Sequence, residues 1–99
     1  MQIIERHVKK VRPDKWAKIE QKEKAFDAVE AKHGFPPKRH YRLLAGADDN
    51  NTLVMERQWE IFAAMEAAYE KAMADPEWQA LDVSDLYKGR HIEIALPWP

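Results

Sequence analysis

Five side chains of this chain are of the types that acid–base catalysis uses, and they fall into three short segments. Glu5 and His7 lie two residues apart near the N-terminus, Glu56 lies in mid-chain, and His91 and Glu93 lie near the C-terminus. A carboxylate beside a histidine can orient the imidazole while it takes a proton from a substrate, and clustered carboxylates drive their pKa values apart. This chemistry requires a fold that brings the three segments together, with His7, Glu5 or Glu56 as the base.

Two further residues would complete such a site. Arg42 could stabilise the anion that proton removal leaves on a substrate. Val54 would line the site together with His91 and Glu93, since ligand pockets combine apolar walls with a few convergent polar groups. We therefore assign Arg42, Val54, His91 and Glu93 to ligand binding.

The same residues also fit a purely structural role. A buried charge must find a partner, and the arginines available to the glutamates are Arg6, Arg42, Arg57 and Arg90. His7 and His91 would then be hydrogen-bonded or solvent-facing histidines of neighbouring strands. Both explanations stay open at the level of sequence.

The composition excludes most cofactor-dependent chemistries. The 99 residues contain no cysteine, and the four histidines show no two-ligand spacing such as His-Glu-x-x-His. The three glycines form no phosphate-binding loop. We expect neither a metal nor a cofactor, although a single histidine could still hold haem.

Charge and hydropathy limit the partners. Sixteen Lys and Arg residues against seventeen Asp and Glu residues give a formal net charge of −1, which favours neither nucleic acid nor an anionic membrane. The N-terminal residues introduce charge at Glu5 and lack the apolar core of a signal peptide. We expect a cytoplasmic protein that binds no nucleic acid and no membrane.

The periodicity of the chain predicts an α+β fold. Alternating β-branched and polar residues predict strands over residues 2–8, 39–45, 52–58 and 91–96. Helices are predicted over 13–33 and 60–74, and Asp75-Pro76 ends the second helix and begins a short third one, closed by Lys88-Gly89. The order βαββαβ is ferredoxin-like, with the fourth strand beside the first, then the third, then the second. We assign residues 1–99 to a single domain.

Side-chain alternation divides this sheet into two faces. The face under the helices is predicted to carry Ile4, Val8, Leu53, Met55, Ile92, Ile94 and Leu96. The open face would then carry Glu5, His7, Val54, Glu56, His91, Glu93 and Ala95, with Arg42 and Leu44. Because this face is substantially apolar, we expect two copies to pack through it as a homodimer around a small-molecule pocket. A shift of one residue would move every side chain to the other face.

Several motifs resemble those of NIPSNAP-family domains. The most specific are Asn51-Thr52-Leu53-Val54, the helix that follows, and Asp75-Pro76-Glu77-Trp78-Gln79. The segment Ile4-Glu5-Arg6-His7 and Pro13 resemble the first strand and turn of the family, with Asp14 in place of its usual glycine. Leu96-Pro97-Trp98-Pro99 resembles its Pro-rich, aromatic C-terminal end.

The resemblance implies a dimeric α/β barrel made of two ferredoxin-like chains. Relatives in that superfamily use the barrel cavity for oxygenation, isomerisation or cyclisation, so the likeness implies no single reaction. One hypothesis is a cofactor-independent enzyme or binder for an apolar carbonyl or phenolic metabolite. The other is a non-catalytic dimerisation or interaction module, in which the polar residues simply pair across the barrel.

Overall fold

The computed structural model describes residues 2–46 and 50–98. Its elements are β1 (Ile3–Val11), the 3₁₀ turn η1 (Pro13–Lys15), α1 (Trp16–Lys32), β2 (Lys38–Arg42), β3 (Thr52–Trp59), α2 (Phe62–Met73), α3 (Pro76–Gln79) and β4 (Tyr87–Ala95). The predicted βαββαβ order, with a short extra helix before the last strand, is confirmed. The turn predicted between the second and third strands includes residues 47–49, which lie outside the described residues.

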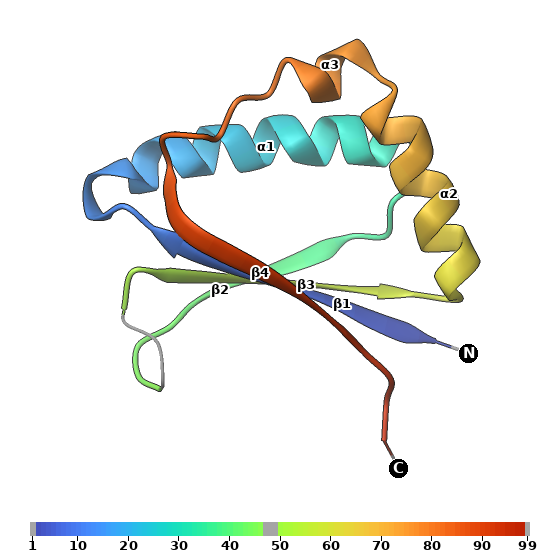
Figure 1. Cartoon of the computed structure of the whole chain (residues 1–99), viewed down its shortest axis with the longest axis horizontal. Coiled ribbons are helices and arrows are strands. Elements are labelled where there is room, and N and C mark those ends of the chain that lie inside the picture. Colours follow the sequence, from blue (N-terminus) through green and yellow to red (C-terminus); the bar gives the residue numbers. More distant parts are fainter. Residues whose placement is uncertain (1, 47–49, 99) are drawn as a thin grey trace.

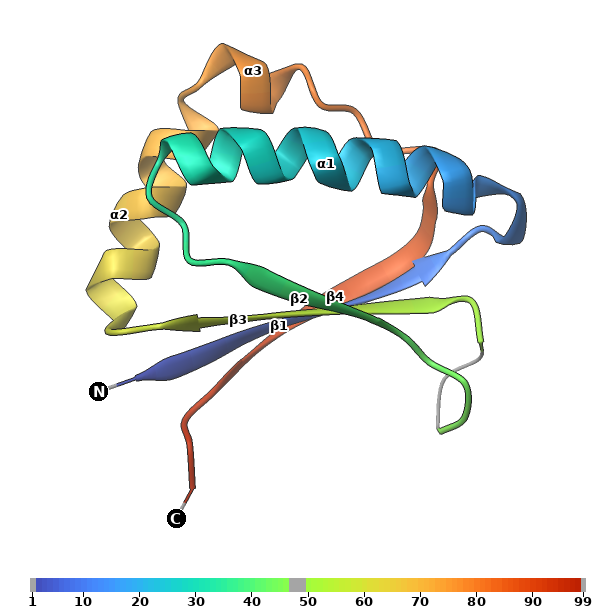
Figure 2. The same ribbon diagram turned by 180° about the vertical axis from the view of Figure 1, so that it is seen from behind.

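The four strands form one antiparallel sheet in the order β2-β3-β1-β4, as predicted. α1, α2 and α3 all lie on one side of the sheet, and its other side carries no helix (Figure 1 and Figure 2). This is a ferredoxin-like α+β fold, in which one sheet face is covered and one is open. None of the described helices is both long enough and apolar enough to span a membrane.

Local sequence explains where the helices begin and end. Pro13 opens the turn before α1, and α1 is followed by Gly34, whose φ of 78° is a conformation that favours glycine. α2 stops before Pro76, which cannot continue a helix. Asp75 then caps α3, because its side chain accepts a hydrogen bond from the Glu77 backbone nitrogen at 2.9 Å.

Several boundaries differ from the prediction. α3 ends at Gln79 instead of continuing to Lys88-Gly89, because the Asp82 side chain accepts a hydrogen bond from the Ser84 backbone nitrogen at 2.9 Å and forms a turn. β4 therefore begins earlier, at Tyr87, and contains the residues expected to close the helix. β2 is shorter than predicted and ends at Arg42.

The register of β1 places its odd-numbered residues under the helices. Glu5 accepts a hydrogen bond from the hydroxyl of Tyr69 in α2, and Lys9 pairs with Glu23 of α1. His7 lies between them on the same face, opposite Met55 of β3. The predicted register of this strand is therefore wrong by one residue.

The shift divides the predicted pocket between the two faces. Glu5, His7 and Arg42 lie on the helix-covered face, whereas Val54, Glu56, His91 and Glu93 lie on the open face. Ile4 and Val8, expected under the helices, also belong to the open face. The polar residues of β1 can lie beneath helices because α1 and α2 supply charged and hydroxyl partners for them.

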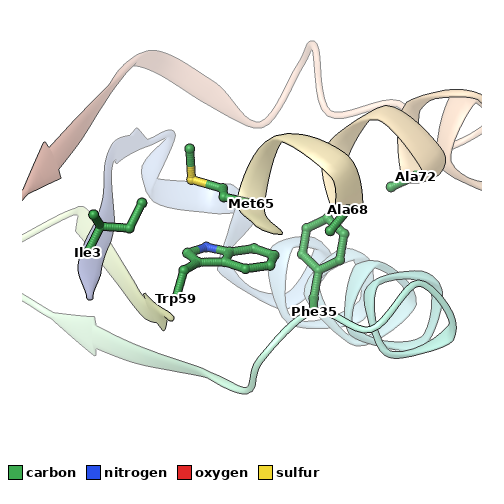
Figure 3. Packing of buried hydrophobic residues seen from close by; sticks show 6 residues of the cluster. All are labelled: Ile3, Phe35, Trp59, Met65, Ala68 and Ala72. Carbon is green, nitrogen blue, oxygen red and sulfur yellow. The ribbon is translucent and has the colours of Figure 1, made fainter. Parts of the chain in front are cut away.

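Two apolar clusters lie at opposite ends of the layer between sheet and helices. One consists of Ile3, Phe35, Trp59, Met65, Ala68 and Ala72 (Figure 3). Phe35 packs edge-to-face against Trp59 and Tyr69, with ring centroids 5.3 and 4.9 Å apart. The other cluster consists of Val11, Ile19, Leu53 and Leu86. The polar residues of β1 lie between the two clusters.

The C-terminal half of β4 extends away from the helices (Figure 1). Ile92, Ile94 and Leu96 were expected to be buried, but they are 59%, 45% and 59% exposed. Ile92 and Ile94 do share a face with His7 and Glu5, so their side is as predicted. Ile94 and Leu96 belong to the part of the chain that extends away from the helices, and Ile92 lies at its border, in the lining of the pocket described below.

Candidate functional site

A pocket of about 590 Å³ lies between the helix-facing side of the sheet and the three helices. This volume falls within the roughly 300–1,000 Å³ of small-molecule sites. Its apolar walls include Phe26, Met55, Met73, Trp78, Leu81 and Val83. Its polar lining includes His7, Lys9, Glu23, Lys38, Tyr69 and Arg90. The pocket therefore lies inside one chain, under the helices, and not on the open face where the sequence predicts it.

Glu5 and His7 form a close pair at this pocket. His7 Nε2 lies 2.6 Å from Glu5 Oε2, and His7 lines the pocket directly. Glu5 lies behind it and is only 2% exposed. The Tyr69 hydroxyl donates to the same carboxylate oxygen, and Trp59 Nε1 donates to Oε1 at 2.9 Å. Three donors on three different elements thus fix one buried carboxylate.

These contacts keep Glu5 ionised and fix which nitrogen of His7 faces it. Burial raises the pKa of Glu5, but the hydrogen bonds from His7, Tyr69 and Trp59 outweigh it and lower the pKa to about 2. Burial and the adjacent carboxylate raise the pKa of Tyr69, which keeps its hydroxyl a donor. An ionised carboxylate only accepts hydrogen bonds, so Nε2 of His7 must carry the proton that it donates to Glu5. The neutral imidazole then has its free lone pair on Nδ1.

A network of ion pairs borders the other side of the pocket. Glu23 of α1 lies 3.3 Å from Lys9 Nζ and 3.0 Å from Lys38 Nζ. Glu30, two turns further along α1, lies 2.9 Å from Lys38 Nζ and 2.8 Å from Arg57 Nη2. Burial raises the pKa of Glu23, but its hydrogen bond to His40 and the two lysines lower it far more. Glu23 therefore remains charged, and both glutamates are paired with cations beneath the helix.

Arg57 joins this network to the Glu5–His7 pair. Its side chain is 1% exposed, and its Nη1 atom lies 4.0 Å from Glu5 Oε1. The guanidinium also packs over the Phe35 ring, with its central carbon 4.7 Å from the ring centroid. Within residues 2–46 and 50–98, its Nε and Nη1 atoms have no hydrogen-bond partner. Arg57 thus adds positive potential beside Glu5 without forming a direct hydrogen bond to it.

On the open face, the predicted site residues form ion pairs with one another. Arg6 lies 3.3 Å from Glu56 and 2.8 Å from Glu93. His91 Nε2 lies 3.1 Å from Glu93 Oε2, and both side chains are exposed. Glu56 therefore lies on the opposite face of the sheet from His7. For Glu56 and Glu93, the structural explanation is the one that the geometry supports.

Two further predicted ligand-binding residues also lie away from the pocket lining. Arg42 donates from Nε to the Asn50 carbonyl oxygen at 2.8 Å and packs over the Trp16 ring at 4.2 Å. Val54 is 2% exposed, but it belongs to the open face of β3. His91 borders the pocket from β4, although its imidazole pairs with Glu93.

Several residues of the site could not be identified from single motifs. Tyr69 and Trp78 continue the apolar spacing of their helices, and Lys9 belongs to a run of basic residues, so none of the three carries a catalytic signal in the sequence. One signal did indicate a charged interior, because Glu23 occupies the same helical stripe as the apolar Ile19 and Phe26. A carboxylate in an inward stripe requires cations on the surface that faces it.

Comparison with known proteins supports the fold and adds one functional neighbour. No family model matches the sequence, and no curated protein matches it. An uncharacterised NIPSNAP-like domain protein from Burkholderia xenovorans has a solved structure with a TM-score of 0.82 at 20% identity, covering 98% of this chain and 85% of that one. A NIPSNAP family protein from Agrobacterium tumefaciens gives 0.83 at 18% identity, covering 99% and 94%. SnoaB from Streptomyces nogalater, described as a cofactor-independent oxygenase, gives 0.67 at 18% identity, covering 99% and 94%.

Fold and site together define the class of this protein. It is a ferredoxin-like α+β protein with a pocket between sheet and helices, and a buried carboxylate–histidine pair lies at that pocket. More narrowly, the chain has the fold of the NIPSNAP-domain proteins, over nearly its whole length. The resemblance that the motifs predict is thus confirmed at the level of the fold.

Proposed function

We propose that the protein is a cofactor-independent enzyme that removes a proton from an apolar carbonyl or phenolic metabolite. The observation that carries this proposal is the 2.6 Å contact between His7, which lines the pocket, and the buried Glu5 behind it. A base, a group that orients it and a space for a substrate are the three parts that general-base catalysis requires.

His7 is the proposed base, and Glu5 is the residue that positions it. Since Nε2 donates to Glu5, Nδ1 is the nitrogen that accepts the substrate proton. Proton transfer turns His7 into an imidazolium, and the charge of Glu5 stabilises that cation. The Tyr69 and Trp59 donors keep Glu5 in place, so that the imidazole ring stays oriented during the reaction.

The substrate class follows from the walls of the pocket. Phe26, Met55, Trp78 and Val83 favour an apolar body with a ring. Loss of a proton from such a ketone or phenol gives an enolate or phenolate, which can isomerise, cyclise or react with oxygen. SnoaB, a neighbour in fold, is described as a cofactor-independent oxygenase. This neighbour supports the proposed type of chemistry and leaves the substrate to be identified.

We also propose that the protein acts as a homodimer. On the open sheet face, beside the ion pairs of Arg6, Ile4 is partly exposed, whereas Val8 and Val54 are only 3% and 2% exposed. Beside it, β4 exposes Ile92 and Ile94. Exposed apolar surface of this kind is typical of association sites. The charged side chains of the open face form ion pairs with one another within one chain. This face is therefore better suited to association than to catalysis.

A hydrogen-exchange assay tests the enzymatic proposal. 2-Tetralone, an apolar bicyclic ketone with acidic C–H bonds, is the probe, and its exchange in D₂O is followed by NMR. We expect the protein to accelerate exchange over buffer, and His7→Gln to remove roughly 10²–10⁴-fold of that acceleration, the usual contribution of a general base. His33→Gln is the matched control, since His33 pairs with Asp75 away from the pocket lining, and it should retain the activity.

Two results would contradict the proposal. One is exchange in the presence of the protein that is no faster than in buffer. The other is an acceleration that survives in His7→Gln. Circular dichroism of both variants ensures that a lost rate does not reflect a lost fold.

A further inference from the structure

We propose that the natural ligand of the pocket is an apolar, ring-bearing carboxylic acid whose carboxylate binds Arg90. The inference rests on the proposed function, since it assigns a substrate class to the pocket that contains His7.

Among the residues that the structure describes, each carboxylate of the interior is already engaged. Glu5 accepts hydrogen bonds from His7, Trp59 and Tyr69. Glu23 pairs with Lys9 and Lys38, and Glu30 pairs with Lys38 and Arg57. Asp27 lies at the edge of the network, 3.1 Å from Lys38. The interior anions and the cations Lys9, Lys38 and Arg57 thus form one connected set.

Arg90 lines the same pocket but does not belong to that set. It lies opposite Lys9 in the register of β1 and β4, so its side chain shares the helix-facing side of the sheet. In the part of the chain that the structure describes, no carboxylate lies within ion-pair distance of its guanidinium. The residue is exposed, which places this cation at the mouth of the pocket.

The positive charge of Arg90 is felt inside the pocket. Burial is the main reason that the pKa of Lys9 is lowered, and Arg90 lowers it further. Arg90 also opposes the rise that burial causes in the pKa of Tyr87. A ligand anion beside Arg90 would reduce the repulsion between Arg90 and Lys9. A carboxylate there is therefore favoured both by its contact with Arg90 and by this reduced repulsion.

The strand register limits the shape of the ligand. His7 lies opposite Ile92, so Arg90 is its diagonal neighbour on the adjacent strand, roughly 7–8 Å away. An acid whose carboxylate reaches the long Arg90 side chain can therefore present a C–H or O–H about one ring away to His7. The apolar walls, including Trp78 and Ile92, would enclose that ring.

A carboxylate fits Arg90 better than a phosphate monoester does. One guanidinium binds one carboxylate through two parallel hydrogen bonds and neutralises its charge. A phosphate dianion would bring a second negative charge near Glu23, whose cations are already paired. Phosphate binding is therefore an outcome that the experiment must be able to detect.

The test compares three probes that share one ring system: 2-naphthoate, the neutral 2-naphthamide and 2-naphthyl phosphate. Dissociation constants are measured by isothermal titration calorimetry on the 99-residue chain at pH 7 and low salt. We expect naphthoate to bind about tenfold or more tightly than naphthamide, the usual worth of a charge-assisted bidentate contact. Arg90→Gln should abolish this preference, and Arg90→Lys should retain part of it. Arg12→Gln, which removes an exposed arginine outside the pocket lining, should leave the preference unchanged.

Several results would overturn the inference. These are equal affinities for naphthoate and naphthamide, a preference that survives in Arg90→Gln, tighter binding of naphthyl phosphate, or no binding of any probe. The proposed function fails separately. If the carboxylate preference depends on Arg90 but His7→Gln leaves proton exchange unchanged, the ligand class stands and the catalytic role falls. If His7 catalyses exchange of 2-tetralone without any carboxylate preference, only the ligand class falls.

Discussion

Replacing Glu5 with glutamine removes the charge around which His7, Trp59 and Tyr69 are arranged. The pKa of this carboxyl falls from 4.5 to about 2 because those three donors outweigh its burial. A difference of this size corresponds to about 3 kcal/mol in favour of the folded state at neutral pH. The side chain is 3% exposed, so solvent does little to screen its contacts.

The sign of the pH dependence follows from the direction of the shift. The folded pKa lies below the unfolded one, so the stabilisation is complete above pH 4.5 and is lost as the pH falls toward 2. We expect Glu5→Gln to lower the free energy of unfolding by about 3 kcal/mol at pH 7 and by only about 1 kcal/mol at pH 3. Urea denaturation, monitored by tryptophan fluorescence at one protein concentration, measures both values.

Glu56→Gln is the matched control for this prediction. It makes the same chemical change on the open face, where Glu56 pairs with the partly exposed Arg6. Such surface pairs contribute about 0–1 kcal/mol. If the two variants lose equal stability, or if the loss in Glu5→Gln does not shrink at acidic pH, the assignment of Glu5 as a buried, ionised anchor is wrong.

Three further perturbations test other parts of the structure. Asp75→Ala removes the cap of α3 and should lower the melting temperature by roughly 4–8 °C. Asp82→Ala, in an exposed turn, should change the melting temperature much less. Equal shifts in the two variants would count against the cap. Lys38→Met leaves two buried carboxylates of α1 short of a cation and should lower the free energy of unfolding, measured by urea denaturation, by about 3 kcal/mol. Lys24→Met, which removes one partner of an exposed helical ion pair, should have only a small effect. Ile94→Asp places a charge on the exposed apolar surface of β4 and should shift sedimentation from a dimer toward the 11.6 kDa monomer; a wild-type protein that already sediments as a monomer would refute the dimer.

The elements and their order could be predicted because local signals determine them. Pro13, Gly34 and the Asp75-Pro76 pair mark helix boundaries through backbone chemistry that tertiary structure cannot easily override. The short helix was overextended because Leu81 and Leu86 continue an apolar spacing that suits a helix. The turn at Asp82 depends on one side-chain hydrogen bond, and an apolar pattern does not reveal such a bond.

The face of β1 could not be predicted by the same means. The strand has apolar residues of both parities, with Ile3 and Val11 on one side and Ile4 and Val8 on the other. Counting apolar residues assumes that the face beneath helices is the more apolar one. Here that face carries Glu5 and Lys9, which are 2% and 8% exposed and are paired with side chains of α1 and α2. The rule fails because charges that find partners can be buried.

The two explanations of the acidic residues that the sequence leaves open therefore apply to different residues. Glu56 and Glu93 form ion pairs with Arg6 on the open face, as the structural explanation requires. Glu5 instead holds a histidine at the wall of a pocket. Stability alone does not require a histidine to line a pocket beside a fixed carboxylate. Nor does it require an arginine at the mouth of that pocket to lie beyond ion-pair distance of every carboxylate that the structure describes. Since a bound acid would provide a partner for both His7 and Arg90, this pocket is where a ligand would satisfy groups that the fold does not.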